Sequence, residues 1–143
     1  MMFEKILLAT DGSVHAQKAL NYARDLAEAA GGKVIVVHAF EPISPLWGDA
    51  IQDEQIKKRV TAGEEIAGQA VQVLEEAGIK VETEILEGPP ADAILRVGDT
   101  RQPDLIIMGT RGRSEPTSLL LGSVSHRVMA HSKIPVMVIR AES

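Results

Sequence analysis

The 143-residue sequence predicts an α/β fold, in which a single doubly wound sheet of five parallel strands carries helices on both faces. Three observations lead to this fold class. Short apolar runs alternate along the chain with segments whose apolar residues recur every three or four positions. Glycine or proline separates most of these segments. Parallel strands need a crossover between them, and the helical segments supply one each time.

The first half of the chain begins with a wholly apolar strand at residues 6–9 and a helix that starts after Ser13. Serine is a favoured residue at helix N-termini, and Gly31 and Gly32 end the helix. A second strand is predicted at 34–39. Residues 40–52 contain Pro42, Pro45 and Gly48 and are predicted as a loop. The long helix that follows ends at Gly78.

The second half begins with residues 81–85, where apolar and charged residues alternate. This pattern predicts a strand with one solvent-facing side, at an edge of the sheet. Two prolines open a short helix over 91–97. A strand at 104–108, a helix at 123–130 and a strand at 135–139 complete the order. We expect residues 1–143 to form one domain.

The most informative motif is Gly109-Thr110-Arg111-Gly112, followed after nine residues by Gly122-Ser123-Val124-Ser125. It directly follows the strand at 104–108 and leads into a helix. Glycines let backbone N–H groups approach an anion, and a helix start adds unpaired donors and a positive dipole end. Arg111 and Arg113 add positive charge. The motif predicts a phosphate site, and the alternative is a long turn that binds nothing.

A second polar loop, residues 10–13, follows the first strand. Ligands of such sheets bind beyond the carboxyl ends of the strands, where the strand order reverses. If the first and fourth strands are neighbours, this loop and the glycine motif flank one crevice. Asp11 then either contacts the ligand or serves the N-terminus of the next helix, and the two roles are compatible. His38 is predicted to be a hydrogen-bonded core residue rather than a catalyst.

Composition argues against several classes of protein. The net charge is −5 and no basic run is present, so we expect neither a nucleic-acid nor a membrane partner. The chain has no cysteine, which excludes disulfides and thiolate chemistry. No apolar segment is long enough to span a bilayer and no signal peptide is evident, so a cytoplasmic location is expected. His126 and His131 point to different helix faces, and no metal site is predicted.

The sequence resembles the universal stress proteins, and specifically their ATP-binding branch, over essentially the whole chain. The resemblance rests on residues 6–13, on His38, and on the glycine motif, in which two residues separate the first glycines and nine precede Gly122-Ser123. It implies a Rossmann-like fold of the adenine nucleotide alpha hydrolase type, with an ATP pocket at the carboxyl edge of the sheet. Mg²⁺ could accompany the ATP, because phosphate oxygens hold it with few protein ligands.

The resemblance also implies binding roles for individual residues. Asp11 would contact the adenosine, with Ala9 and Thr10 leading to it, and Ala39 would offer its backbone to the adenine. Met108 and Gly109 would line the base and ribose. The implied phosphate residues are Arg111, Gly112, Arg113, Gly122, Ser123, Val124 and Ser125. The chain departs from the family pattern in two places, Ala9 in place of a frequent proline and Glu115-Pro116 inside the phosphate loop.

The leading functional hypothesis is an ATP-binding regulatory protein of the stress response, whose nucleotide occupancy or dimeric state is the signal. The last strand, residues 134–139, is apolar on both faces, and a bare edge of this kind would aggregate, so we expect a homodimer through it. No catalytic residue is assigned, because a P-loop lysine and paired carboxylates are both missing from the sequence motifs. Alternatives are a nucleotide-independent interaction protein of the same fold and a slow ATP hydrolase.

Overall fold

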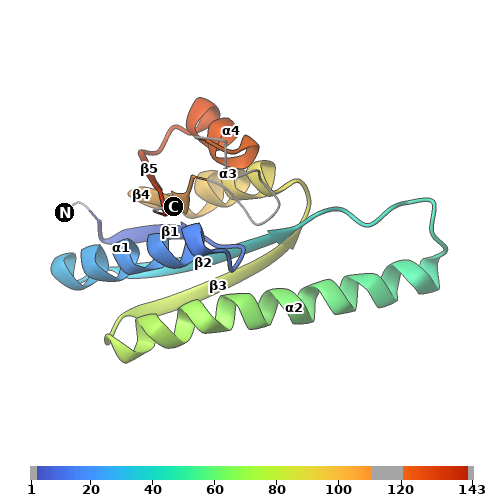
Figure 1. The fold of residues 1–143 in the computed structure, drawn as a ribbon, viewed down its shortest axis with the longest axis horizontal. Coiled ribbons are helices and arrows are strands. Elements are labelled where there is room, and N and C mark those ends of the chain that lie inside the picture. The colour runs from blue at the N-terminus through green and yellow to red at the C-terminus, as the bar shows by residue number, and fades with distance from the viewer. Residues whose placement is uncertain (1–2, 111–120, 142–143) are drawn as a thin grey trace.

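The computed structural model describes residues 3–110 and 121–141, and these form the predicted α/β fold (Figure 1). Strands and helices alternate along the chain in the predicted order. Their bounds are β1 Lys5–Ala9, α1 Val14–Ala30, β2 Lys33–Phe40, α2 Asp49–Glu76, β3 Lys80–Glu87, α3 Pro90–Arg101, β4 Leu105–Gly109, α4 Ser123–His131 and β5 Val136–Ile139.

The strands form one parallel sheet in the order β3-β2-β1-β4-β5, so β1 lies at its centre. The chain winds outward from β1 to β3, returns to β4 on the other side of β1, and ends with β5. The strand order therefore reverses between β1 and β4, which is the point where open α/β sheets bind ligands. The first and fourth strands are neighbours, which is the condition for the two polar loops to flank one crevice.

Pairing of the central strand stops earlier than pairing in the outer parts of the sheet. The last registered pairs of β1 are Ala9 with Val37 of β2 and Leu8 with Ile107 of β4. In contrast, β2 and β3 stay paired as far as Phe40, and β4 and β5 as far as Gly109. The carboxyl edge of the sheet therefore has a notch at its middle strand.

Helices cover both faces of the sheet, and the alternation of side chains along each strand divides the core in two (Figure 1). Ile6 and Leu8 of β1 pack in the core under α1 and α2, whereas Leu7 and Ala9 pack in the core under α3 and α4. Ile6, Leu7 and Leu8 are fully buried. Full burial of such a side chain contributes about 1.5–3 kcal/mol, so β1 is anchored from both faces of the sheet.

Helix α1 begins and ends where the sequence predicts. The Ser13 hydroxyl accepts a hydrogen bond from the Ala16 N–H at 3.2 Å, which is the expected N-cap contact. Gly31 closes the helix at φ 67°, a left-handed conformation that costs glycine little. The helix lies across β1 and β4, so its N-terminal turn is fixed beside the ends of both strands.

Two helices are longer than predicted. Helix α2 begins at Asp49 inside the predicted loop, because Gly48 has the extended conformation of an N-cap and Asp49 suits a first turn. Helix α3 runs past Gly98 to Arg101. A glycine usually weakens a helix, but Gly98 is buried under Ile134 and Ile106, and packing outweighs its low propensity.

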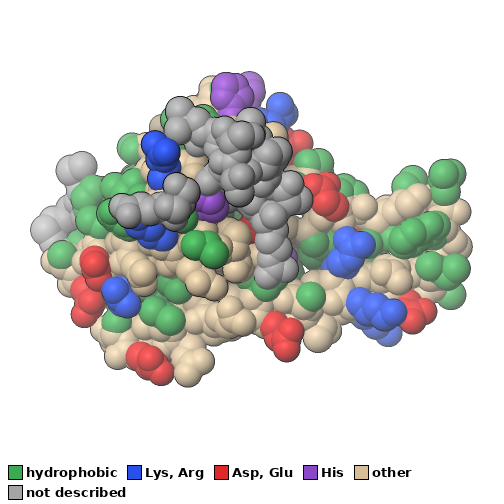
Figure 2. All heavy atoms as spheres, in the orientation of Figure 1, with side chains coloured by type: hydrophobic (Ala, Val, Ile, Leu, Met, Phe, Trp, Pro, Cys, Tyr) green, Lys and Arg blue, Asp and Glu red, His purple; other side chains and the backbone are tan. Residues whose placement is uncertain are grey.

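The N-terminal half of α2 extends beyond the sheet (Figure 1). The helix has 28 residues, about 42 Å, and its buried residues begin only at Gly63. Leu46, Trp47 and Ile51, which lead into and start the helix, are 93%, 42% and 52% exposed. Apolar side chains are visible at this end of the molecule in Figure 2. None of the helices in the described ranges has the length and hydropathy to cross a bilayer.

The edge strand β3 is protected by charge, and its predicted solvent-facing side is present. Arg101 donates to Glu84 at 2.8 Å and also pairs with Glu82, while Lys33 lies 3.5 Å from Glu82. Desolvation raises the pKa of Glu82, but the Lys33 and Arg101 cations and their hydrogen bonds together lower it further, so the pKa lies below its ordinary value. Charged side chains of this kind keep an edge from pairing with another strand.

Gly109 is required by the packing of α1 and not only by an approaching ligand. A Cβ at this position would lie 2.6 Å from the His15 Cβ and 2.9 Å from the His15 carbonyl carbon. Real Cβ contacts are essentially never so short, and the backbone of a helix cannot move aside as a flexible side chain could. The first turn of α1 therefore reaches β4 only because residue 109 has no side chain.

We expect Gly109→Ala to lower the free energy of unfolding by about 1–3 kcal/mol, the usual cost of overpacking. Urea denaturation of the two proteins measures this difference. Gly68→Ala is the control, because an added Cβ there meets nothing within 4 Å on the exposed side of α2. That substitution should raise the free energy of unfolding by about 0.5–1 kcal/mol. Equal effects at the two sites would contradict the packing role of Gly109.

Candidate functional site

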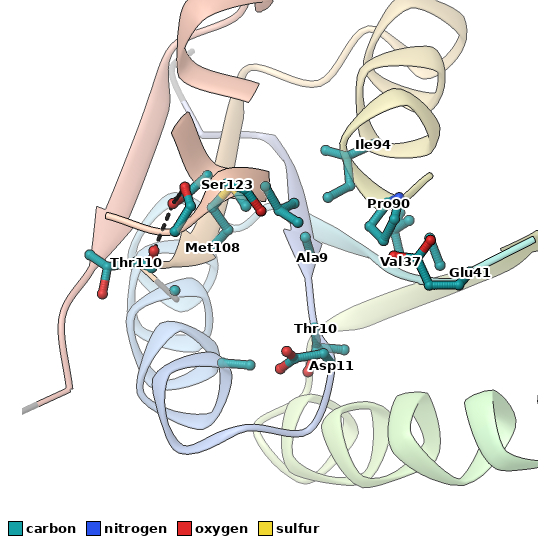
Figure 3. Close-up of a pocket in the computed structure, with 16 residues that line it drawn as sticks. Ala9, Thr10, Asp11, Val37, Glu41, Pro90, Ile94, Met108, Thr110 and Ser123 are labelled. Atoms are coloured by element: carbon teal, nitrogen blue, oxygen red, sulfur yellow. Dashed lines mark hydrogen bonds between the residues drawn. The ribbon is translucent and has the colours of Figure 1, made fainter. Parts of the chain in front are cut away.

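A cavity of about 250 Å³ opens at the notch in the carboxyl edge of the sheet. Figure 3 shows Ala9 of β1 between Met108 of β4 and Val37 of β2, with Asp11 below and Pro90 and Ile94 of α3 above. The full lining is Ala9, Thr10, Asp11, Ala16, Val37, Ala39, Glu41, Pro90, Ile94, Met108, Gly109, Thr110, Gly122, Ser123, Val124 and Ser125.

Ten of the site residues predicted from the sequence line this cavity. They come from separate parts of the chain, residues 9–11, Ala39, residues 108–109 and residues 122–125, and the fold brings them together. The remaining predicted residues, Arg111, Gly112 and Arg113, lie outside the described part of the chain. In the described residues, the loop after β1 and the two ends of the glycine motif thus flank one crevice.

One end of the cavity is formed by the start of α4. Gly122 is the N-cap, and the first hydrogen bond of the helix runs from the His126 N–H to the Gly122 carbonyl at 2.9 Å. The amides of Val124 and Ser125 precede that bond and belong to the first turn, where helix geometry provides no partner within the helix. The positive end of the helix dipole also lies here, so this end of the cavity favours an anion.

Thr110 holds the start of α4 against the sheet. Its N–H donates to the Ile139 carbonyl of β5 at 3.0 Å, and its carbonyl accepts from the Gly122 N–H at 2.6 Å and from the Ser125 hydroxyl at 2.7 Å. The Ser125 side chain is 2% exposed and lies also 3.1 Å from the Gly122 carbonyl. The Ser125 hydroxyl therefore anchors the helix, and what this residue offers to the cavity is its backbone.

The opposite end of the cavity carries the acidic residues, Asp11 and Glu41. One Asp11 carboxylate oxygen accepts the Ser13 N–H at 2.9 Å, and the Thr10 hydroxyl accepts the Gly12 N–H at 3.2 Å. These bonds fix the turn between β1 and α1 and present Asp11 at the cavity wall. The two roles that the sequence left open for Asp11 are compatible in the structure, because the residue both holds the turn and lines the cavity.

Between the two ends the walls are apolar, and one backbone edge interrupts them. Ala9, Val37, Ile94 and Met108 supply the apolar surface. Ala39 follows the last β2 residue that pairs with β1, since the register stops at Ala9 with Val37. The Ala39 N–H and carbonyl face the β1 side of the strand, and in the described residues no strand pairing occupies them there. This peptide edge lies at the cavity.

Several residues around the cavity were not predicted. Pro90 and Ile94 lie four positions apart on α3 and so share one face of it, but the position of α3 depends on strand order, which the sequence does not reveal. Glu41 belongs to none of the sequence motifs, so it was not assigned to the site. His15, in the first turn of α1, was not considered as part of the site: its Nδ1 accepts the Ala141 N–H at 3.0 Å and lies 3.4 Å from the Thr110 hydroxyl.

Metal-ligating side chains do not gather around this cavity in the described residues. No group of three or more His, Cys, Asp or Glu there is arranged to hold a metal ion. Asp11 and Glu41 are the charged groups of the described lining. Within these ranges, the arrangement offers apolar walls, a peptide edge, two carboxylates and the N-terminal amides of a helix, which together suit binding of an amphipathic anion.

A doubly wound sheet with such a cavity at the reversal of strand order defines a class of nucleotide- or anion-binding α/β proteins. Comparison with known proteins narrows the class. The model of the universal stress protein family matches residues 2–140, and the chain belongs to this family. A universal stress protein of Thermus aquaticus is 40% identical over 140 residues, which cover 97% of this chain and 100% of the relative.

Solved structures agree with this assignment. The structure of MJ0577, a universal stress protein of Methanocaldococcus jannaschii, superimposes with a TM-score of 0.92 at 28% identity, covering 100% of this chain and 99% of the other. The universal stress protein from Archaeoglobus fulgidus in complex with dAMP has a TM-score of 0.70 at 25% identity, covering 97% and 99%. The predicted family and fold are thus confirmed.

We expect Ser125→Ala to lower the free energy of unfolding by about 1–2 kcal/mol, because the buried bond to the Thr110 carbonyl is lost. Thr100→Ala, on the exposed side of α3, is the control and should change it by less than about 0.5 kcal/mol. Chemical denaturation of both variants measures the difference. A Ser125→Ala protein as stable as the control would show that this hydroxyl does not anchor α4.

Proposed function

We propose that this chain binds ATP in the cavity at the carboxyl edge of its sheet and acts as a nucleotide-dependent regulatory protein of the stress response. One observation carries the proposal: the ends of β1, β2 and β4 and the start of α4 converge on a single cavity. Mg²⁺ would accompany the nucleotide, held chiefly by phosphate oxygens. The proposed unit is a single domain, residues 1–143.

The charges in the cavity determine which end of the proposed nucleotide lies at which end of the cavity. Phosphates would lie at the start of α4, where helix amides and the dipole stabilise negative charge. The carboxylates of Asp11 and Glu41 would repel phosphates, so the nucleoside belongs at their end. Asp11 would accept a hydrogen bond from the ribose, and the peptide edge of Ala39 would meet the base. Arg111, Gly112 and Arg113 complete the proposed phosphate site.

The relatives support an adenine nucleotide as the ligand. The A. fulgidus structure is a complex with dAMP, which supports an adenine nucleoside as part of the proposed ligand. The choice of ATP over a monophosphate rests on the glycine motif and its arginines, which provide for more than one phosphate. The proposal is a binding function, and ATP turnover faster than about one per second would contradict it.

Gly122→Val should raise the dissociation constant for ATP at least tenfold, because the isopropyl group would occupy space beside the α4 amides. The backbone conformation of Gly122, with φ −77° and ψ 170°, is one that valine also adopts. The effect must therefore come from volume. Isothermal titration calorimetry measures the affinity, and mass spectrometry of nucleotide released from freshly purified protein identifies the natural ligand.

Gly68→Val is the matched control for this measurement. Gly68 lies on the exposed side of α2, away from the cavity, and the same added volume should leave ATP affinity unchanged. Equal affinities of the Gly122→Val and wild-type proteins would place the ligand elsewhere. Wild-type protein that neither retains nucleotide nor binds ATP would instead favour the nucleotide-independent alternative.

We further propose that the protein is a homodimer in which residues 134–139 of two copies pair. Strand β5 is the last strand of the sheet order, and Val136, Met137 and Val138 are only half-buried in the single chain. Unlike β3, this edge has apolar side chains on both faces. Pairing with a second copy would satisfy the free backbone groups of the edge and cover those side chains.

Val138→Lys should convert the dimer to a monomer at micromolar concentration, because the substitution puts a charge at the proposed interface. Val138 is not part of either core cluster, so the fold should tolerate the change. Sedimentation velocity measures the mass of each protein. Ile51→Lys, at the exposed end of α2, is the control and should remain dimeric. Monomeric wild-type protein would contradict the proposed dimer, and monomer in the control alone would move the interface to α2.

A further inference from the structure

Where β1 separates from β2, the carbonyl of Thr10 has a side chain as its hydrogen-bond partner in place of a backbone N–H. Thr10 donates its N–H to the Val37 carbonyl at 3.0 Å, as a parallel ladder requires. In a continued ladder the Thr10 carbonyl would next accept the Ala39 N–H. It instead lies 2.8 Å from Nδ1 of His38. The register accordingly ends at Ala9 with Val37.

The direction of this hydrogen bond follows from its chemistry. A carbonyl oxygen only accepts, so Nδ1 of His38 carries the proton and donates. The His38 side chain is 9% exposed, and the bond is therefore shielded from water. Nδ1 of His38 thus takes the place at the Thr10 carbonyl that the Ala39 N–H would have in a continued ladder. The side chain of His38 ends the ladder, and the peptide edge of Ala39 stays open toward the cavity.

The packing of α2 fixes the His38 ring in this position. A Cβ on Gly63 would lie 2.8 Å from Cδ2 of the ring and 2.9 Å from the Ile85 side chain. Gly63 is buried in the middle of α2, where glycine costs about 0.5–1 kcal/mol relative to alanine. The helix therefore accepts a less stable residue at a position where it meets the ring.

From this geometry we infer that His38 is a positioning residue for base recognition: by holding the Thr10 carbonyl, it keeps the Ala39 N–H and carbonyl available to the edge of an adenine. The inference rests on the proposed function. Adenine offers an acceptor at N1 and a donor at its amino group, which complement one N–H and one carbonyl. Hypoxanthine, the base of ITP, has a donor at N1 and an acceptor at O6. It would therefore place its N–H against the Ala39 N–H and its carbonyl against the Ala39 carbonyl.

The test compares ATP and ITP on three proteins. Wild-type protein should bind ATP at least tenfold more tightly than ITP, because unmatched polar groups at a desolvated edge weaken binding. In His38→Leu the Thr10 carbonyl regains the Ala39 N–H as its donor, the edge closes, and ATP affinity should fall about tenfold with the ATP-to-ITP ratio near one. His38→Asn restores a side-chain N–H donor and should keep the ratio within about threefold of wild type.

Amide hydrogen exchange tests the same inference without a ligand. In the wild-type protein the Ala39 amide should exchange much faster than the Val37 amide, and in His38→Leu it should become protected by the new bond to Thr10. Gly63→Ala, which presses on the ring from α2, should also lower the ATP-to-ITP ratio. His131→Leu, at the exposed end of α4, is the control and should match wild type in every measurement.

The outcomes separate this inference from the proposed function. If wild-type protein binds ATP and His38→Leu keeps both its affinity and its preference over ITP, the role of His38 is overturned while ATP binding stands. If wild-type protein binds no nucleotide, the proposed function fails and base recognition with it. Slow exchange of the Ala39 amide in unliganded wild-type protein overturns the inference by itself, even where a His38 variant does not fold.

Discussion

The early end of backbone pairing at the central strand is the constraint on which the site depends. Both outer pairs of strands continue past the point where β1 stops, so the middle of the sheet edge is open while its flanks are closed. Unpaired main-chain groups at such an edge need partners. In this protein some of them are paired by side chains, and others face a cavity where a ligand can take that place.

Side chains that hold the backbone open are therefore as important as those that would touch a ligand. Ser125 and Thr110 fix the start of α4 through buried hydrogen bonds, and His38 fixes the end of β1. The Ser125 and His38 side chains donate to the Thr110 and Thr10 carbonyls, so neither side chain takes up a backbone N–H group at the cavity. Groups that are held in place before a ligand arrives lower the entropy cost of binding.

The sequence was informative where the structure is local. Ser13 and Gly31 fixed the limits of α1, and the alternation in β3 identified an edge strand, because capping and solvent exposure act over a few residues. The glycine motif and Asp11 were placed in one site for the same reason, since each directly follows a strand. Strand order depends on packing across the whole chain, and the positions of Pro90 and Ile94 followed only from it. The role of Gly109 against His15 was equally invisible, because those residues are distant in sequence.

The two edges of the sheet differ in a way that limits how copies of this chain can assemble. Lys33, Glu82, Glu84 and Arg101 make the β3 edge unsuitable for strand addition, whereas β5 is apolar. Growth of a continuous sheet through many molecules needs two receptive edges on each molecule. With a single receptive edge, contact between like edges consumes both of them, and polymerisation ends after one step.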